Sequence, residues 1–266
     1  MKKSERDRIK EKILSINPDR WWGDDFDIRF YLISKLKSIT NEFVLDVGGG
    51  IGIVSSEISD SNTRINLDFS FDELKTCKLK TDNYIQNICG TMTDLPFKDF
   101  SFDSVISSSV LQYARNSDVK KNLIIYKNKI NEYPSVEKSL SEIHRILKPK
   151  GIFLIDFSDG KKLKHNLSNE EIEWLNADHL LYYERFFSDD KKILYTRELI
   201  IHKEKGLIKE YIRHKRIYSA EDIIELLKQT GFSRISVSGK LSINSQQNRN
   251  TGMMGDRIII TATVIT

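Results

Sequence analysis

A short apolar run that ends in glycines constrains the fold of this chain more than any other feature. Residues 43–47 read as a buried strand, and Gly48, Gly49 and Gly50 follow directly, with Gly52 two positions later. Glycine has no Cβ and allows positive φ, so a ligand can lie against such a turn. The spacing is G-x-G-x-G, unlike the dinucleotide fingerprint G-x-G-x-x-G, and no Gly-Lys-Ser/Thr ending marks a P-loop. We therefore predict a cofactor-binding turn, with a helix beginning just after Gly52.

The following sequence alternates apolar runs with helical patterns. Further strands are predicted at 64–68, 83–88, 104–107 and 152–157, and the clearest helix covers 136–147. This alternation is typical of an α/β protein whose parallel sheet has helices on both faces. After residue 159 the pattern predicts a helix over 168–187, a β-hairpin of 193–202 and 207–218, a helix that starts at Ser219 and closes at Gly231, and two last strands at 235–237 and 257–264.

Composition narrows the class of protein. The chain has 266 residues, and its two Cys cannot build a disulfide framework. No Cys/His cluster has zinc spacing, so no metal is expected and a reduced, cytoplasmic compartment is favoured. The N-terminal segment carries alternating charges and leads into no apolar run, which argues against a signal peptide. No stretch of about 18 apolar residues predicts a membrane span.

Three more segments carry polar groups at predicted strand ends. Asp68 ends the second strand, where a carboxylate can accept hydrogen bonds from both ribose hydroxyls of a nucleoside. Asp94 follows the third strand, where an acid can accept from an adenine amine while apolar neighbours such as Leu95 flank the ring. The fourth strand ends in three small residues, Ser107 to Ser109, which we expect to face the crevice.

These four elements, in this order, resemble the class I S-adenosylmethionine-dependent methyltransferases. The segment 143–151 is similar to the family's helix end and turn before strand five, and the likeness covers roughly residues 40–160. The resemblance implies S-adenosylmethionine as cofactor and a Rossmann-like seven-stranded sheet whose last strand is antiparallel. It implies that the glycine loop takes the methionyl part and that Asp46 orients its amino end. The cofactor-binding residues expected are Asp46, Gly48, Gly50, Gly52, Asp68, Phe69, Asp94, Leu95, Ser109, Trp22 and Arg29.

We expect one domain of four parts, with an N-terminal helical cap (1–42), a cofactor-binding core (43–159), a substrate-side insertion (160–218) and the end of the core sheet (219–266). Within the cap, Trp22 either closes over the ligand or covers the core, and Arg29 either meets the cofactor carboxylate or lies on a solvated face. Residues 114–134 exceed the usual connection and predict a lid or partner helix.

Two residues are candidates for catalysis. His179 is expected on the helix of the insertion, where a neutral imidazole can accept a proton, although a structural role is the alternative. Tyr113 lies just past the fourth strand, near the expected methyl position, and is a candidate for orienting the acceptor. Direct methyl transfer needs a general base only if the nucleophile must first lose a proton.

The acceptor is the least constrained part of the prediction. Residues 191–216 carry nine Lys or Arg against three Glu, which is either a solvated face or a contact for an anionic acceptor or RNA. The Ser-Ser-Ser end of strand four differs from the Asn/Asp-Pro-Pro-aromatic signature of nucleic-acid base methylases. The insertion resembles that of amino-sugar N-methyltransferases that pair through such hairpins, so we expect a small-molecule acceptor and a homodimer through 191–216. The alternatives are an RNA methyltransferase and a catalytically silent, cofactor-binding regulatory subunit.

Overall fold

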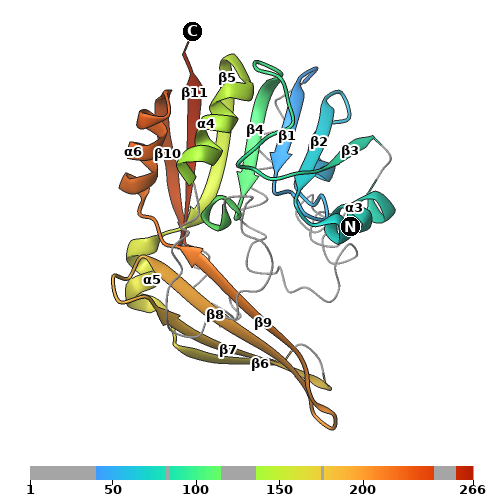
Figure 1. Ribbon diagram of the computed structural model, residues 1–266, viewed down its shortest axis with the longest axis vertical. Helices are drawn as coiled ribbons and strands as arrows, with labels where there is room; N and C mark the ends of the chain where they lie inside the picture. Colours follow the sequence, from blue (N-terminus) through green and yellow to red (C-terminus); the bar gives the residue numbers. More distant parts are fainter. Residues whose placement is uncertain (1–39, 82–83, 115–135, 175–176, 243–255, 266) are drawn as a thin grey trace, which may run out of the picture.

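The computed structural model describes residues 40–81, 84–114, 136–174, 177–242 and 256–265 (Figure 1). Seven strands form one sheet in the order β10-β11-β5-β4-β1-β2-β3. Their bounds are β1 (Phe43–Val47), β2 (Thr63–Asp68), β3 (Ile85–Cys89), β4 (Phe102–Ser108), β5 (Leu147–Ser158), β10 (Phe232–Ser242) and β11 (Asp256–Val264). Trp22 and Arg29, most of the N-terminal cap, and nearly all of the 114–134 segment lie outside the described residues.

The direction of the strands positions the site. Strands β1 to β5 run parallel, while β11 is antiparallel to both β5 and β10. The chain builds β2 and β3 on one side of β1 and then crosses to β4 on the other side, so the strand order reverses between β1 and β4. Open α/β sheets bind ligands at the carboxyl ends of the strands beside such a reversal. The expected Rossmann-like seven-stranded fold is confirmed.

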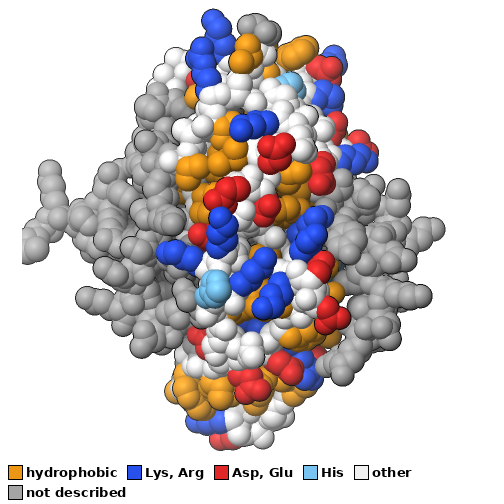
Figure 2. Space-filling model, turned by 90° about the vertical axis from the view of Figure 1, so that its left-hand side faces the viewer, with side chains coloured by type: hydrophobic (Ala, Val, Ile, Leu, Met, Phe, Trp, Pro, Cys, Tyr) orange, Lys and Arg blue, Asp and Glu red, His pale blue; other side chains and the backbone are white. Residues whose placement is uncertain are grey.

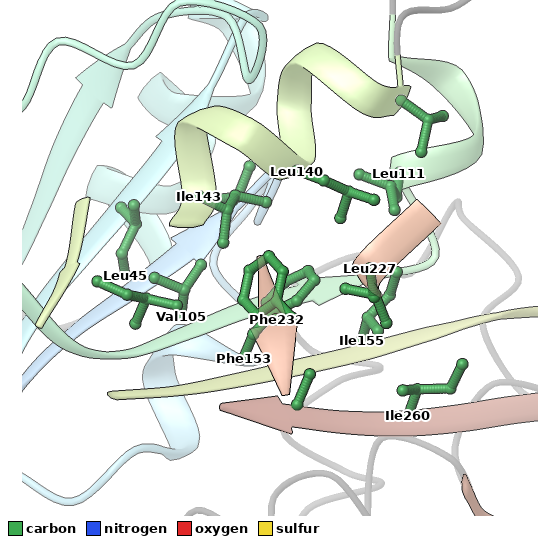
Figure 3. Packing of buried hydrophobic residues seen from close by; sticks show 14 of the residues in the cluster. Leu45, Val105, Leu111, Leu140, Ile143, Phe153, Ile155, Leu227, Phe232 and Ile260 are labelled. Carbon is green, nitrogen blue, oxygen red and sulfur yellow. The ribbon is translucent and has the colours of Figure 1, made fainter. Parts of the chain in front are cut away.

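One face of the sheet packs against α4 (Val136–Ile146) and α6 (Ala220–Gln229). Leu45, Val105 and Phe153 come from neighbouring strands and meet Leu140 and Leu227 from the two helices (Figure 3). Successive residues of a strand point to opposite faces of the sheet, and α4 has apolar residues at helical spacing, so the strand residues on this face and the apolar side of α4 bury a common core. Helix α3 (Phe71–Lys80) packs on β2 and β3. None of the helices in the described ranges combines the length and apolar character that crossing a bilayer requires.

The insertion is largely β-structure. It begins with α5 (Gly160–Asn166) and continues as a four-stranded antiparallel sheet of β6 (Glu170–Trp174), β7 (His179–Phe187), β8 (Ile193–His202) and β9 (Gly206–Arg216). The hairpin predicted around residue 206 is confirmed, and Gly206 adopts the positive φ of 74° that its turn requires. This sheet lies on the side toward which the carboxyl ends of β1 and β4 point (Figure 1).

Two predicted helices are wrong. The described part of segment 168–187 forms β6 and β7, because buried Leu181, Tyr183 and Arg185 alternate along β7 with a period of two. The aromatic residues of β7 favour a strand, and pairing with β8 overrides the helical spacing of a few leucines. After Gly52 the chain forms turns and the short 3₁₀ helix η2 (Ser55–Glu57) in place of an α-helix. Glycines and the β-branched Ile51, Ile53 and Val54 are weak helix formers, which accounts for the difference.

Candidate functional site

The glycine loop connects β1 to η2 across the end of β2. The Gly48 N–H donates to the Leu67 carbonyl over 2.7 Å, which fixes the loop on the neighbouring strand. Gly48, Gly50 and Gly52 have φ of 74°, 54° and 78°, the left-handed region that glycine tolerates best. A Cβ on Gly48 would come within 2.5 Å of Val110, which follows β4. The loop is therefore seated directly against the segment that leaves β4.

Asp68 lies at the end of β2, facing the loop. Its Oδ2 accepts from the Gly50 N–H over 3.0 Å, and its Oδ1 accepts from the Ser70 N–H over 2.8 Å. A carboxylate has about four acceptor sites, so each oxygen can accept a further hydrogen bond from a ribose hydroxyl. A Cβ on Gly50 would lie 3.9 Å from Asp68 Oδ2, so a side chain there would occupy the space beside the carboxylate. This cradle fits the nucleoside part of S-adenosylmethionine.

Two polar residues lie under the loop, of which Asp46 was predicted from the sequence and Asn66 was missed. The Asn66 Nδ2 donates to the Gly50 carbonyl over 3.0 Å, and a Cβ on Gly49 would come within 2.3 Å of Asn66 Oδ1. Asp46 is 1% exposed, and its Oδ2 accepts from the Ser55 hydroxyl over 2.7 Å. Asn66 lies opposite Asp46 in the β1–β2 register, and a polar residue within an apolar strand was the available signal.

The loop after β3 starts beside Asp68. The Gly90 N–H donates to the Asp68 carbonyl over 3.0 Å, and the Asp94 N–H donates to the Thr91 carbonyl over 3.3 Å. Asp94 is exposed, whereas Leu95 is 3% exposed within the core. Thr91 follows β3 more closely than Asp94 and was not singled out by the sequence pattern. Phe69 is 81% exposed next to Asp68. The structure thus brings Asp68, Asp94 and the glycine loop to one edge of the sheet.

Ser109 follows β4 and is held by hydrogen bonds to Asp156 and Arg257. It has a φ of 63°, its hydroxyl donates to Asp156 Oδ2 over 3.3 Å, and the Arg257 guanidinium contacts both Ser109 and Asp156. Asp156 and Arg257 are buried and come from β5 and β11, so their pairing with Ser109 depends on strand order that local sequence does not reveal. Tyr113 lies in η3 (Leu111–Tyr113), which packs against β9.

His179 lies away from this edge. It is the first residue of β7, pairs with His202 across the strands, and its ring centroid is 5.0 Å from that of His202. His202 adjoins the turn that joins β8 to β9, and this tip is well separated from the glycine loop in Figure 1. His179 is therefore on a strand tip and not on a helix over the site. Its catalytic role stays a prediction, as does that of Tyr113.

The positive charge of the hairpin formed by residues 191–216 is less exposed than its composition indicates. Arg197 forms ion pairs with Glu184 and Glu210 at 3.3 and 2.6 Å, and Lys215 is 3% exposed, with its Nζ 3.3 Å from the Ser158 hydroxyl. On one face of the molecule, Lys and Arg side chains gather in the middle, with Asp and Glu side chains around them (Figure 2). The local positive charge is thus divided between paired, buried and exposed groups.

Comparisons with known proteins agree with this geometry. Residues 45–155 match the methyltransferase domain family. An uncharacterized protein of Methanocaldococcus jannaschii is 34% identical over 141 residues, covering 53% of this chain and 50% of its own length. A demethylmenaquinone methyltransferase of Renibacterium salmoninarum is 30% identical over 148 residues, covering 55% and 52%. The chain thus spans about half the length of these curated relatives.

Solved structures extend the likeness over the whole chain. An S-adenosylmethionine-dependent methyltransferase from Clostridium acetobutylicum has a TM-score of 0.66 at 16% identity, covering 98% of both chains. At that identity the likeness supports the fold. The matched methyltransferase domain and the cradle at Gly50 and Asp68 fit S-adenosylmethionine as the cofactor. Residues 45–155 therefore form a methyltransferase domain, in a chain that has the fold of S-adenosylmethionine-dependent methyltransferases.

Proposed function

We propose that this protein transfers a methyl group from S-adenosylmethionine to an N, O or C nucleophile of a small-molecule acceptor. The bound cofactor supplies a methyl group already activated on a sulfonium. The contribution of the chain is then to hold the nucleoside at Asp68, to seat the methionyl part on the glycine loop, and to orient the acceptor away from water.

The observation that most supports a small-molecule acceptor is the contact between the insertion and the segment that follows β4. Strand β9 packs against η3, which follows β4, so the insertion contacts the carboxyl edge of the core sheet. A wall over that edge favours a ligand that can be enclosed.

A relative supports the same direction. The matched Renibacterium salmoninarum protein is named as a methyltransferase of demethylmenaquinone, which is a small molecule compared with RNA. We therefore rank a small-molecule acceptor above RNA, and a quinone is one chemical class to include among the acceptors tested.

We also infer that two copies of the chain pair through the outward face of the four-stranded sheet. This face carries Ile172 and Trp174 of β6, Phe186 of β7 and Ile212 of β9, which are between 51% and 63% exposed. The opposite face buries Leu181, Tyr183 and Leu194 within the molecule. An exposed apolar patch on a sheet favours association.

Tritium-labelled transfer tests the acceptor class. The protein is incubated with S-adenosyl-[methyl-³H]methionine and either a metabolite extract below about 1 kDa or total RNA from the same cells, with the Asp68→Ala variant as control. Label in the low-mass fraction that depends on Asp68 supports the proposal. Label confined to RNA overturns it in favour of an RNA methyltransferase. Cofactor binding by calorimetry without label in either fraction overturns it in favour of a silent subunit.

A further inference from the structure

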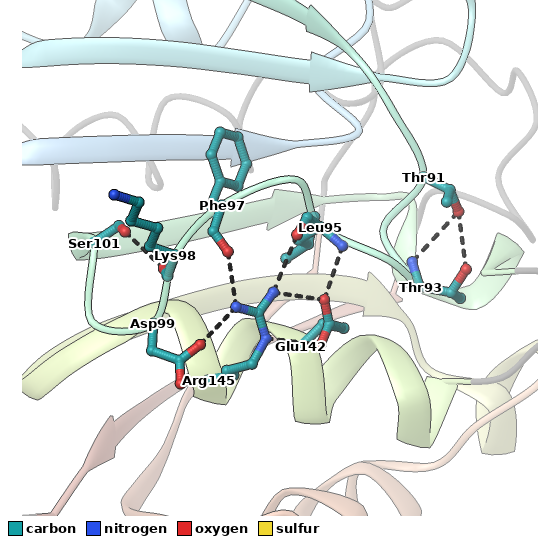
Figure 4. A network of polar contacts seen from close by, with 9 residues as sticks. All are labelled: Thr91, Thr93, Leu95, Phe97, Lys98, Asp99, Ser101, Glu142 and Arg145. Atoms are coloured by element: carbon teal, nitrogen blue, oxygen red, sulfur yellow. Dashed lines mark hydrogen bonds and ion pairs between the residues drawn. The ribbon is translucent and has the colours of Figure 1, made fainter.

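Two side chains of α4 hold the loop that follows β3 (Figure 4). Glu142 Oε2 accepts from the Leu95 N–H over 2.8 Å, and Arg145 donates to the Leu95 carbonyl over 3.0 Å and to the Phe97 carbonyl over 2.7 Å. Both backbone polar groups of Leu95 are thus bonded to one helix. Because Leu95 is buried, its N–H would be costly to leave without a partner, while its carbonyl also accepts from the Phe97 N–H over 2.8 Å.

The two side chains also fix each other. Arg145 Nε donates to Glu142 Oε1 over 2.9 Å, Arg145 Nη2 donates to Glu142 Oε2 over 2.8 Å, and Asp99 accepts from Nη1 over 2.8 Å. The planar guanidinium matches a carboxylate with two parallel bonds, so the pair is held in one geometry. The hydrogen bond from Arg145 keeps the pKa of Glu142 below its ordinary value, so the pair is charged at neutral pH.

The held loop lies between two anchors. At its start, Gly90 is bonded to the Asp68 carbonyl, and at its end Leu95 is bonded to α4. Residues 91–94 span the gap, and the Asp94 N–H closes on the Thr91 carbonyl. The exposed side chain of Asp94 thus projects from a segment whose path depends on both anchors. Moving the Leu95 anchor would displace this segment while leaving Asp68 on its strand.

We propose that Glu142 and Arg145 are positioning residues that set residues 91–94 for recognition of the adenine ring of the cofactor. The inference rests on the proposed use of this edge for S-adenosylmethionine. The two residues act through the loop backbone and do not touch the ring. Their substitution therefore changes how well the site distinguishes adenine from a base that lacks the 6-amino group.

Calorimetry with S-adenosylhomocysteine and S-inosylhomocysteine tests this role, since the two ligands differ at position 6 of the base. We expect Arg145→Lys to lower the affinity for S-adenosylhomocysteine about tenfold and the affinity for S-inosylhomocysteine less than about twofold. Lysine keeps the charge, but its three donors on one nitrogen cannot replace the five hydrogen bonds that the planar Arg145 guanidinium makes to two carbonyls, Glu142 and Asp99. Glu142→Gln should also lower the affinity for S-adenosylhomocysteine, by about threefold. Glu137→Gln is the matched control, because Glu137 is exposed in the first turn of the same helix.

The variants are compared well below their unfolding midpoints, so that loss of folded protein does not enter the affinities. An equal loss of affinity for both ligands, or no loss for either, overturns the positioning role and makes the pair purely structural. Failure of the unmodified protein to bind either ligand overturns the proposed function and this inference with it. A lower preference for the adenine ligand in Arg145→Lys, with the Glu137→Gln protein unchanged, supports the inference.

Discussion

Asp68 is the residue on which we expect the cofactor site to depend most. Its two oxygens already accept from Gly50 and Ser70, so the carboxylate is oriented before any ligand arrives. We expect Asp68→Ala to weaken S-adenosylmethionine binding at least tenfold, or about 1.4 kcal/mol, because charged hydrogen bonds to ribose are lost. Calorimetry measures the affinity, with exposed Asp72→Ala on α3 as control. Unchanged affinity in Asp68→Ala would remove this residue from the site.

Comparing alanine substitutions at Gly52 and Gly206 separates the cost of backbone strain from the cost of a steric clash. Gly52 has a φ of 78°, and a Cβ there would lie 2.4 Å from Cys77 Sγ. Gly206 has a φ of 74° with nothing within 4 Å of a Cβ. We expect Gly206→Ala to lower the free energy of unfolding by about 1 kcal/mol through strain alone. Gly52→Ala should cost a further ~1–3 kcal/mol through overpacking. Urea unfolding compares the two, and equal losses would show that the Cys77 contact is unimportant.

Single residues also show where sequence reasoning stopped. Gly48, Gly50 and Gly52 are recognisable because positive φ is a local demand of the turn. Gly49 must lack a side chain because Asn66 and Asp46 lie directly beneath it. The Ser109 side chain is held by Asp156 and Arg257, which come from other strands. These contacts arise only after distant strands have been placed side by side, so spacing along the chain does not reveal them.

Elements of the core could be predicted because each obeys one period. The strands β1, β4 and β5 each contain a short apolar run, and α4 and α6 have one apolar face each. The segment 168–187 failed because its leucines also fit a helical period, and only pairing of β7 with both β6 and β8 decides for a strand. The type of an element was thus predictable where its own sequence pattern is decisive. It was not predictable where pairing with neighbouring strands decides the structure, as in β7.

The Glu142–Arg145 pair of helix α4 should make the free energy of unfolding depend on pH. The hydrogen bond from Arg145 lowers the pKa of Glu142 in the folded state below its unfolded value of about 4.3. The stabilisation is therefore complete above that unfolded pKa and is lost as pH falls through the lower, folded pKa. We expect the difference in unfolding free energy between the unmodified protein and Glu142→Gln to shrink as pH falls from about 6 to 3. Urea titrations across this range measure it, and a constant difference would contradict the prediction.

At the scale of the whole molecule, the two faces of the insertion differ in burial, and we expect them to serve different functions. The inward face buries Arg185, paired with Glu171 at 2.9 Å, and Lys215 beside the end of β5, so it is tied to the core. The outward face bears exposed apolar residues around the ion pairs of Arg197. One layer can thus enclose the acceptor side of the site and also present a surface to a second copy.

The outward face therefore predicts the assembly. Replacing both Phe186 and Ile212 with Lys places charges on β7 and β9, on either side of β8, where each side chain is 51% exposed and its loss leaves the core intact. Burying unpaired charge between two sheets is unfavourable, so we expect the double variant to sediment as a monomer and the unmodified protein as a dimer. Leu79→Lys on α3, 77% exposed in the unmodified chain, is the control that should remain dimeric. A double variant that sediments as a dimer would place the interface elsewhere, and a monomeric unmodified protein would refute the pairing itself.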